Sequence, residues 1–306
     1  MDVCPQLTIL IAAHNCAPWL AETLNSVFAS LADARNRAEI VIINDDSTDD
    51  TQAIIDDYAG RYPHIRTEKT RYRNVGRVRN HAVQMARGDY ILMVDGDDRL
   101  LPDALADRLA LLAQRSPDIL LSKIIETRTD GPQPAWQPAV PEELTQHDAV
   151  ERFLIHRDYQ AHFIGQFFAR RLLQQHAFPD LICYEDTWLF PVMLMHSRKT
   201  LYSRAGFYLY RKHPQSLSSA IDHHKIDCLI EATRHLDEVL PARYAPLITC
   251  HWLDIANRYY SQLHDTPQGK EVEQRLRRMS PLRFMLNGKI RLSYKRKMLT
   301  VRNRGL

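Results

Sequence analysis

The sequence predicts an α/β protein whose sheet is mostly parallel and flanked by helices. Short apolar runs rich in branched residues alternate with longer segments in which apolar residues recur at helical spacing. Three of the runs end in polar or acidic clusters, at residues 14–15, 44–50 and 95–98. Strands and helices that alternate in this way are typical of β-α-β units, whose ligands bind beyond the carboxyl ends of the strands. The three clusters should therefore converge on one edge of the sheet.

The first hundred residues show the clearest alternation. The run LTILIAA at 7–13 is short, apolar and branched-rich, as expected of a strand buried on both faces. Further strands are expected at 39–44, 65–69 and 90–94. The helices are expected from Pro18 to Leu31, from a cap at Ser47 or Thr48 to about Gly60, through residues 76–88, and from Pro102 onward carrying Leu105, Leu109 and Leu112.

The second half of the chain is less regular, although it still alternates. Proline-rich residues 130–141 read as an extended loop, and an acidic pair precedes an apolar helix within 183–197. The remaining expectations are a strand at 118–122, helices with some aromatic strand character over 144–178, a strand ending in a polar loop over 201–218, and a helical stripe from 225 onward.

Composition and charge describe a soluble globular protein with a basic end. Hydrophobic residues make up 45% and charged residues 25% of the 306 residues, and the formal net charge is +3. Residues 270–304 hold twelve Lys or Arg and only two Glu, a net charge of +10. The rest of the chain is therefore acidic, and this end is electrostatically distinct.

The cysteines and apolar runs indicate a reducing compartment. The five cysteines are odd in number, scattered and free of any CxxC pair, which argues against a disulfide framework or a zinc knuckle. We see no signal peptide at the N-terminus, and the longest apolar runs fall far short of the ~20 residues that a membrane span needs. We expect a cytoplasmic protein, or one that sits on a membrane without crossing it.

The segment YILMVDGDDRLLP, residues 90–102, is the most informative motif. A buried strand ends in Asp95, Asp97 and Asp98, whose carboxylates repel one another unless a cation joins them. Mg²⁺ and Mn²⁺ prefer such oxygen ligands and share their coordination shell with phosphate oxygens. Gly96 allows the tight turn that faces the acids toward one ion. The plainer interpretation is a solvated Asp-rich turn that caps the next helix.

The order of the motifs resembles family 2 glycosyltransferases of the GT-A fold. It is carried by LTILIAAHN, EIVIINDDSTDDT, NVGRVRNHAVQMARGDYILMVDGDD and YEDTWLF, nearly continuously over 7–103 and more thinly to about 219. The resemblance implies a GT-A-type, Rossmann-like sheet in a domain spanning 1–220, with a nucleotide-sugar half at 1–105 and an acceptor half at 106–220. Residues 221–306 would form a helical, basic C-terminal extension.

The resemblance also implies which residues bind the donor. Asp45 matches the position that accepts a hydrogen bond from the base, while the usual DDGS reads NDDS, with Asn44 at its first position and Asp46 at the glycine. The residues Asn74, Gly76, Arg77, Arg79 and Asn80, in the stretch NVGRVRN, match a family stretch with the same Asn, Gly, Arg and Asn residues, in which Arg would bind phosphate or base oxygens. The nucleotide-sugar site is thus expected to comprise Ala12, His14, Asn15, Asp45, Asn74, Gly76, Arg77, Arg79, Asp95 and Asp97.

The catalytic and metal-binding residues follow from the same resemblance. Asp186, with Glu185 as its neighbour, matches the base that deprotonates the acceptor hydroxyl during transfer with inversion. Asp97, Asp98 and His213 are the expected ligands of a Mn²⁺ or Mg²⁺ cofactor. Each has a plainer alternative, because acids commonly cap helices and a lone loop histidine is often only a surface residue.

The implied function is an inverting glycosyltransferase that moves a sugar from a nucleotide sugar, expected to be a UDP-sugar. The acceptor would be a saccharide or lipid-linked saccharide in bacterial surface polysaccharide biosynthesis, of capsule, O-antigen, lipopolysaccharide core or exopolysaccharide. The Q-x-x-R-W signature of processive, membrane-embedded relatives is absent from the sequence. The basic residues 270–304 alternate with apolar ones, as in a cationic amphipathic helix on an anionic membrane surface, which would place the enzyme on the inner face of the cytoplasmic membrane. Nucleic-acid binding or a merely solvated tail are the alternatives, and no aromatic RNA-binding signature supports the former.

Other functions account less well for the sequence. A non-catalytic nucleotide-sugar-binding or scaffold protein of GT-A fold would explain the unusual residues Ala12, His14 and Asn44, but not the many retained acids. A nucleotidyltransferase would need a glycine-rich basic loop after the first strand, where AAHNCAPW has no glycine. A dehydrogenase is disfavoured because G-x-G-x-x-G is missing.

Overall fold

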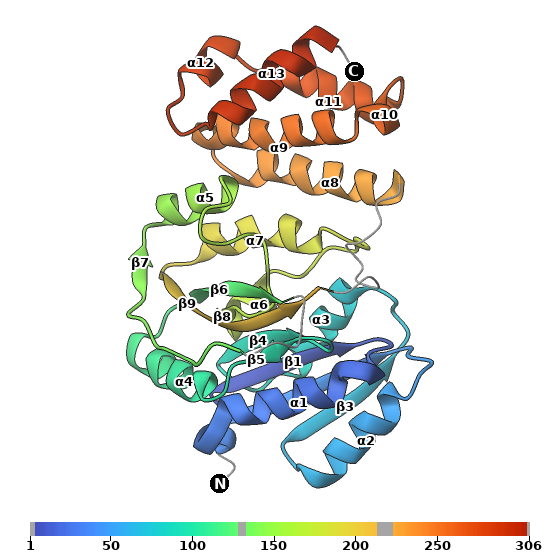
Figure 1. Cartoon of the computed structure of the whole chain (residues 1–306), viewed down its shortest axis with the longest axis vertical. Helices are drawn as coiled ribbons and strands as arrows, with labels where there is room; N and C mark the ends of the chain where they lie inside the picture. The colour runs from blue at the N-terminus through green and yellow to red at the C-terminus, as the bar shows by residue number, and fades with distance from the viewer. Residues whose placement is uncertain (1–3, 128–132, 213–222, 305–306) are drawn as a thin grey trace.

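The computed structural model describes residues 4–127, 133–212 and 223–304 (Figure 1). Its strands occupy the predicted apolar runs, and two further short strands lie at 99–100 and 142–144. The strands are β1 (Leu7–Ala13), β2 (Ala38–Asp45), β3 (Ile65–Thr70), β4 (Tyr90–Asp95), β5 (Arg99–Leu100), β6 (Ile119–Thr127), β7 (Glu142–Leu144), β8 (Phe167–Ala169) and β9 (Thr200–Arg211).

Within these residues the strands form one nine-stranded sheet. Its order is β3-β2-β1-β4-β8-β6-β9-β5, and β7 pairs with β9. The first four strands in this order are mutually parallel, as are β6 and β9, whereas β8 runs antiparallel to both its neighbours. The central strands are buried along nearly their whole length because helices cover both faces. The predicted mostly parallel sheet is confirmed.

Seven helices accompany this sheet in the described part of residues 1–212. Figure 1 shows α1 and α4 along the same face, with α7 beyond β6 and β9. The helices are α1 (Ala17–Leu31), α2 (Thr51–Arg61), α3 (Val75–Met85), α4 (Ala104–Arg115), α5 (Gln146–Leu154), α6 (Arg170–Gln175) and α7 (Glu185–His196).

The start of α2 differs from the sequence-based expectation. We expected Ser47 or Thr48 to cap this helix, but it begins at Thr51, whose backbone N–H donates to Asp49 Oδ1 at 3.1 Å. The Ser47 hydroxyl instead accepts a hydrogen bond from the backbone of Asn15 at 3.0 Å. The cap prediction was wrong because the segment after β2 is tied to the segment after β1, which a local pattern does not reveal.

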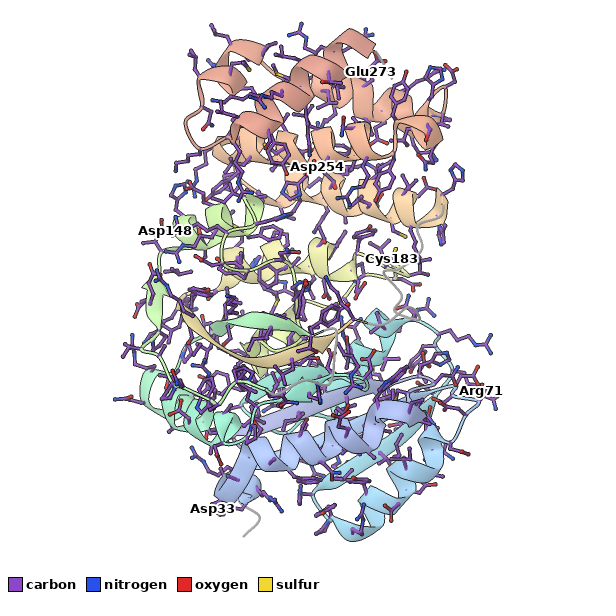
Figure 2. The ribbon with its side chains drawn as sticks, in the orientation of Figure 1. Asp33, Arg71, Asp148, Cys183, Asp254 and Glu273 are labelled. Atoms are coloured by element: carbon purple, nitrogen blue, oxygen red, sulfur yellow. The ribbon has the colours of Figure 1, made fainter. Side chains whose placement is uncertain are left out.

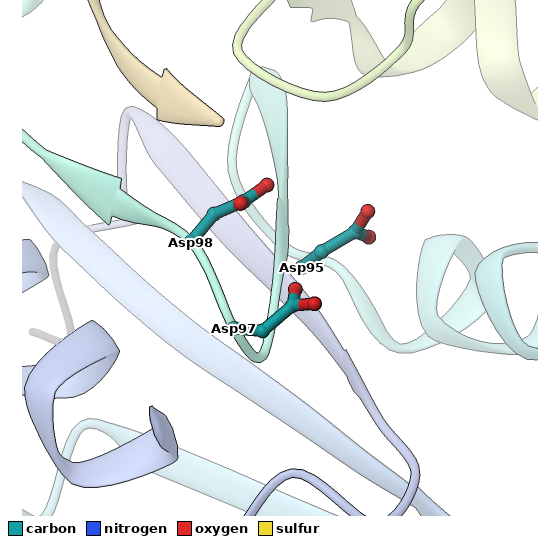
Figure 3. A group of neighbouring side chains, drawn as sticks. All are labelled: Asp95, Asp97 and Asp98. Carbon is teal, nitrogen blue, oxygen red and sulfur yellow. The ribbon is translucent and has the colours of Figure 1, made fainter. Parts of the chain in front are cut away.

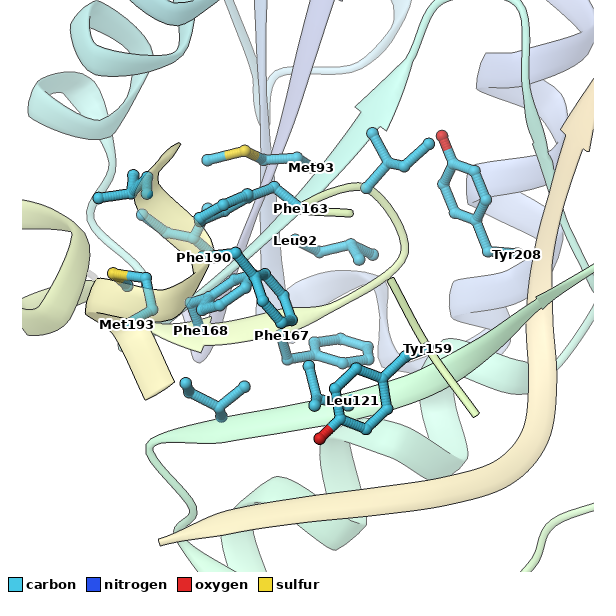
Figure 4. Packing of buried hydrophobic residues seen from close by; sticks show 14 of the residues in the cluster. Leu92, Met93, Leu121, Tyr159, Phe163, Phe167, Phe168, Phe190, Met193 and Tyr208 are labelled. Carbon is cyan, nitrogen blue, oxygen red and sulfur yellow. The ribbon is translucent and has the colours of Figure 1, made fainter. Parts of the chain in front are cut away.

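An aromatic cluster fixes the loop before β8 and the helix α7 against the sheet. Phe163 stacks on Phe168 at 4.7 Å between ring centroids and meets Phe178 at 4.6 Å and Phe190 at 5.9 Å. Figure 4 shows Phe163, Phe168 and Phe190 packed around Leu92 of β4. Because buried rings of this kind contribute more than 1 kcal/mol each, the backbone around residue 163 and the start of α7 are held in place.

The C-terminal residues form a stack of helices at the end of the molecule farthest from α2 (Figure 1). The single amphipathic helix expected for the basic tail is instead three helices, anchored by the buried side chains of Val272, Phe284 and Met298. No helix among the described residues has the length and apolar character required to cross a bilayer. The division of the chain at residue 220 falls outside the described residues and stays a prediction. The helices are α8 (His223–Val239), α9 (Ala245–Arg258), α10 (Tyr260–Leu263), α11 (Pro267–Arg277), α12 (Pro281–Leu286) and α13 (Leu292–Arg304).

Candidate active site

The polar clusters that follow β1, β2 and β4 meet at one edge of the sheet, as predicted. Strand register places Ala12 beside Asp95 on β4, and Ala13 beside Asn44 on β2. The nucleotide, metal and catalytic residues expected from sequence can therefore be compared in one region. The exception is His213, which lies outside the described residues.

Three carboxylates gather where β4 ends (Figure 3). One oxygen from each of Asp95, Asp97 and Asp98 lies within 4.8 Å of the others, close enough for all three to contact one metal ion. A Cβ on Gly96 would lie 2.7 Å from the Cys16 sulfur, so this turn can approach α1 only with glycine. The set of oxygen donors suits Mg²⁺ or Mn²⁺. Asp95 was expected mainly in the nucleotide-sugar site, whereas here it lies with Asp97 and Asp98.

Asp98 is fully buried and held by β9. The Tyr208 hydroxyl donates to Asp98 Oδ2 at 2.6 Å, and the backbone N–H of Arg211 donates to Oδ1 at 2.7 Å. The same hydroxyl accepts from the backbone N–H of Asp95 at 3.1 Å. Burial, with Asp95 and Asp97 nearby, raises the pKa of Asp98 to about 8, a shift that a bound cation would reverse. Sequence reasoning missed Tyr208, because only the β5–β9 pairing brings it to this turn.

Arg79 is the central cation of the site. Its buried guanidinium lies 2.8 Å from Asp186, 3.0 Å from Glu185 and 3.4 Å from Asp95. Although burial lowers the pKa of Arg79, these carboxylates raise it above its usual value. Arg79 thus joins the β4 cluster to the acidic pair of α7. The guanidinium of Arg79, which was expected to bind phosphate or base oxygens, is directed at these carboxylates.

The acidic pair opens α7, where the helix dipole favours negative charge. Burial and the adjacent Asp186 raise the pKa of Glu185 to about 7. Burial also raises the pKa of Asp186, which is less enclosed than Glu185, while Arg79 opposes the shift. Asp186 Oδ2 accepts from the backbone N–H of Phe163 at 3.4 Å, so the aromatic cluster helps to orient it. A carboxyl group whose pKa is raised toward neutrality suits proton transfer.

The other residues of the NVGRVRN stretch that were assigned to the donor contact the segment 178–181, which leads into α7. They are Asn74, Gly76, Arg77 and Asn80. The Asn80 amide exchanges two hydrogen bonds with the backbone of Phe178, at 2.9 and 2.8 Å. Asn74 caps α3 through the Arg77 N–H and donates to the Leu181 carbonyl at 3.1 Å. The Asp180 carboxylate receives both Arg77 and the Asn74 amide. The motif therefore positions the acidic pair, a role that the sequence analysis did not anticipate.

On the nucleotide side, Asp45 is already hydrogen-bonded. Its Oδ1 accepts from the backbone N–H of Tyr72 at 2.6 Å and from the Thr70 hydroxyl at 2.9 Å. His14 Nδ1 lies 2.6 Å from the Asp45 carbonyl oxygen and must donate to it, so His14 Nε2 is left to accept from the Asn15 amide at 3.2 Å. This network orders the three residues without any ligand.

A cavity of about 880 Å³ opens on the other side of the acidic pair. It lies between β6, β9 and the loop 156–166, and we call it the β6–β9 cavity. Most residues of its lining are polar or aromatic, which suits a hydrophilic ligand. The cavity is lined by Ser122, Lys123, Ile124, Glu126, His156, Asp158, Tyr159, Gln160, His162, Ile164, Gln166, Tyr202, Arg204, Tyr210 and Lys212.

The fold, with the acidic cluster at the end of β4, is the GT-A fold of glycosyltransferases. Residues 1–349 of Staphylococcus aureus TarS, solved in complex with UDP-GlcNAc, align with a TM-score of 0.67 and 18% identity, covering 98% of this chain and 92% of that one. The mannosyltransferase PcManGT from Pyrobaculum calidifontis, solved with GDP-Man and Mn²⁺, aligns with a TM-score of 0.54 and 15% identity over 99% and 88%. At these identities the likeness establishes the fold alone.

The sequence matches the glycosyl transferase family 2 profile over residues 8–176, and the chain belongs to this family. The Staphylococcus aureus poly(ribitol-phosphate) β-N-acetylglucosaminyltransferase TarS is 28% identical over 139 residues, which cover 45% of this chain and 24% of TarS. The uncharacterized glycosyltransferase EpsJ of Bacillus subtilis is 26% identical over 235 residues, covering 72% of this chain and 66% of EpsJ. The match thus spans only part of each relative's length.

Proposed function

We propose that the protein is an inverting glycosyltransferase that uses a nucleotide sugar, a UDP-sugar in the first instance. The observation that carries the proposal is the single ion-paired assembly of Asp95, Arg79 and Asp186, which links the β4 carboxylates to the acidic pair of α7. A divalent cation, Mn²⁺ or Mg²⁺, held by the carboxylates of Asp95, Asp97 and Asp98 would neutralise the departing diphosphate. The loops after β1 and β2, with Asp45, would bind the nucleoside.

Asp186 is the proposed general base. It would take the proton from the acceptor hydroxyl as that oxygen attacks the anomeric carbon and the nucleoside diphosphate leaves from the opposite face, which inverts the configuration. Glu185 shares the Arg79 guanidinium and is shielded from solvent. Asp186→Asn should lower the rate of sugar transfer by about 10²–10⁴ while nucleotide binding persists, because the carboxylate acts on the acceptor.

The proposal is tested by the thermal stability of the purified protein with UDP, GDP or CMP, each with and without Mn²⁺. A ligand at 100 times its Kd adds about 2.7 kcal/mol to the free energy of unfolding. Stabilisation by UDP that requires Mn²⁺ is expected for wild type and lost in Asp97→Ala. The matched control is Asp33→Ala, which removes an exposed aspartate near the N-terminus, far from the site (Figure 2).

A non-catalytic nucleotide-sugar-binding or scaffold protein is the second candidate, favoured by the prior engagement of Asp45 with Thr70 and Tyr72. It would show the same stabilisation by nucleotide but no transfer or hydrolysis of any UDP-sugar. Absence of stabilisation by all three nucleotides would count against both candidates.

The proposed setting is bacterial surface polysaccharide synthesis at the inner face of the cytoplasmic membrane, with a saccharide or lipid-linked saccharide as acceptor. Several exposed apolar side chains project from α12 and α13 between exposed cations, and we call these residues the α12–α13 surface. An apolar surface rimmed by cations suits an anionic bilayer interface. The surface comprises Leu282, Arg283, Met285, Leu286, Lys289, Arg291, Leu292, Arg296 and Leu299.

A further inference from the structure

We propose that the β6–β9 cavity binds the acceptor, and that this acceptor is a saccharide carrying an anionic group, a phosphate or a carboxylate. The inference rests on the proposed function, because it assigns the second substrate of the same reaction. It is carried by the position of the cavity and by the cations in its lining.

The cavity shares two walls with the acidic site. His162, in its lining, immediately precedes Phe163, whose backbone N–H donates to the proposed base Asp186. Tyr210 and Lys212, in the opposite wall, flank Arg211, whose backbone N–H holds Asp98. The charge of Arg79 acts on His162, which places this side of the lining near the ion-paired acids, and we infer that an acceptor in the cavity would reach the proposed base from this side.

The charges of the lining favour an anion. Its two carboxylates are already neutralised, because Glu126 accepts from Lys212 Nζ at 2.7 Å and Asp158 lies 3.2 Å from Arg152. Neither Lys123 nor Arg204 forms an ion pair with any residue that the structure describes. Both exposed cations line the cavity, and each suits a phosphate or a carboxylate.

The deeper part of the cavity offers neutral polar groups instead. The Ser122 hydroxyl is buried and has no hydrogen-bond partner among the described residues, while the Gln166 side chain satisfies both backbone groups of Ser122. Burial lowers the pKa of His156 and of His162, so these side chains are uncharged near neutrality. Neutral polar side chains in this part of the lining suit the hydroxyls of a sugar.

The test is equilibrium binding to the full-length protein without donor or metal, measured by calorimetry with three probes of similar length. Glycerol phosphate oligomers supply phosphate, unsulfated hyaluronan oligosaccharides supply carboxylate, and maltotetraose is neutral. We expect at least one anionic probe to bind more tightly than maltotetraose, with an affinity that falls as salt is added. Comparison of the two anionic probes identifies which group the cavity prefers.

Matched variants locate the binding. Lys123→Gln with Arg204→Gln should weaken binding of the preferred anionic probe about five- to tenfold and abolish its salt dependence. Arg87→Gln with Arg198→Gln removes two exposed arginines at the opposite edge of the sheet, before β4 and β9, and should leave binding unchanged.

The proposal is overturned if maltotetraose binds as tightly as both anionic probes, if no probe binds, or if the two double variants weaken binding equally. None of these measurements depends on UDP or on Mn²⁺. A failure here with UDP stabilisation intact would therefore reject the cavity assignment alone, whereas loss of UDP stabilisation with anion binding intact would reject the proposed transferase.

Discussion

At the scale of single residues, the buried side chain of Arg79 is the cation that holds the acidic site together. Arg79 pairs with three carboxylates that would otherwise repel one another, and its removal leaves the buried Glu185 and the partly buried Asp95 and Asp186 without this cation. The acids themselves were readable from sequence, because Asp95, Asp97 and Asp98 directly follow a strand-like run. The partner of those acids was not, since residues 79 and 186 meet only through the tertiary fold.

Replacing Arg79 should therefore destabilise the fold severely. We expect Arg79→Met to lower the free energy of unfolding by about 3–5 kcal/mol, because breaking a buried ion pair leaves uncompensated charge. Arg77→Met is the matched control on the same helix. Its ion pair with Asp180 is more than half exposed on both sides, so Arg77→Met should lower the free energy of unfolding far less than Arg79→Met. Urea denaturation measures both, and equal losses would contradict the central role of Arg79.

Glu185 makes stability depend on pH in a direction opposite to ordinary acid denaturation. Its pKa is raised from 4.5 to about 7 in the folded protein, so the folded state binds more protons than the unfolded state between these values. Stability from this group is full below pH 4.5 and is lost as the pH rises through 7, by up to about 3 kcal/mol.

Denaturation in metal-free buffer between pH 5 and 8 should reveal this loss as a difference from Glu185→Gln, whose stability should decline less with rising pH. The exposed Glu143→Gln serves as the control and should retain the wild-type profile. If Glu185→Gln shows the same pH profile as wild type, the raised pKa is refuted.

At the scale of elements, α3 and the segment 178–181 act as one unit that carries the acidic pair. The sequence predicted α3 correctly from its periodicity, but it assigned Gly76 to the approach of the donor. In the structure a Cβ on Gly76 would lie 3.0 Å from the Pro179 carbonyl oxygen and 3.2 Å from the Phe178 Cβ. Both neighbours belong to a segment that Asn80 holds by its backbone, so they cannot easily move.

Two helical glycines, Gly60 near the end of α2 and Gly76 near the start of α3, test this packing role. Gly60→Ala in α2 meets nothing within 4 Å and should raise the free energy of unfolding by about 0.5–1 kcal/mol through helix propensity. Gly76→Ala should lower it despite the same propensity gain, because of the contacts with residues 178 and 179. Thermal denaturation of both variants decides, and stabilisation by Gly76→Ala equal to that by Gly60→Ala would exclude the packing role.

At the scale of the whole molecule, sequence reasoning succeeded where signals are local and failed where distant segments combine. The strand ends and the family resemblance predicted the sheet and the convergence of its loops. The β6–β9 cavity was not predicted, because its walls come from a strand, a loop and a second strand whose polar residues have no shared spacing. The tail was predicted as helical and basic. Its packing against α9 was not predicted, because buried residues such as Met298 have the spacing expected of one face of a single continuous helix.

The α12–α13 surface leads us to predict that the protein binds anionic membranes. Five of the eight large hydrophobic side chains exposed among the described residues lie between 282 and 299, and neighbouring cations are worth about 1 kcal/mol each near an anionic bilayer. The protein should therefore sediment with phosphatidylserine-containing vesicles, but not with pure phosphatidylcholine vesicles. Leu286→Glu with Leu292→Glu should abolish sedimentation. Val140→Glu with Ile182→Glu removes two exposed apolar residues elsewhere and adds the same charge, so equal loss in that control would reject the surface as the docking site.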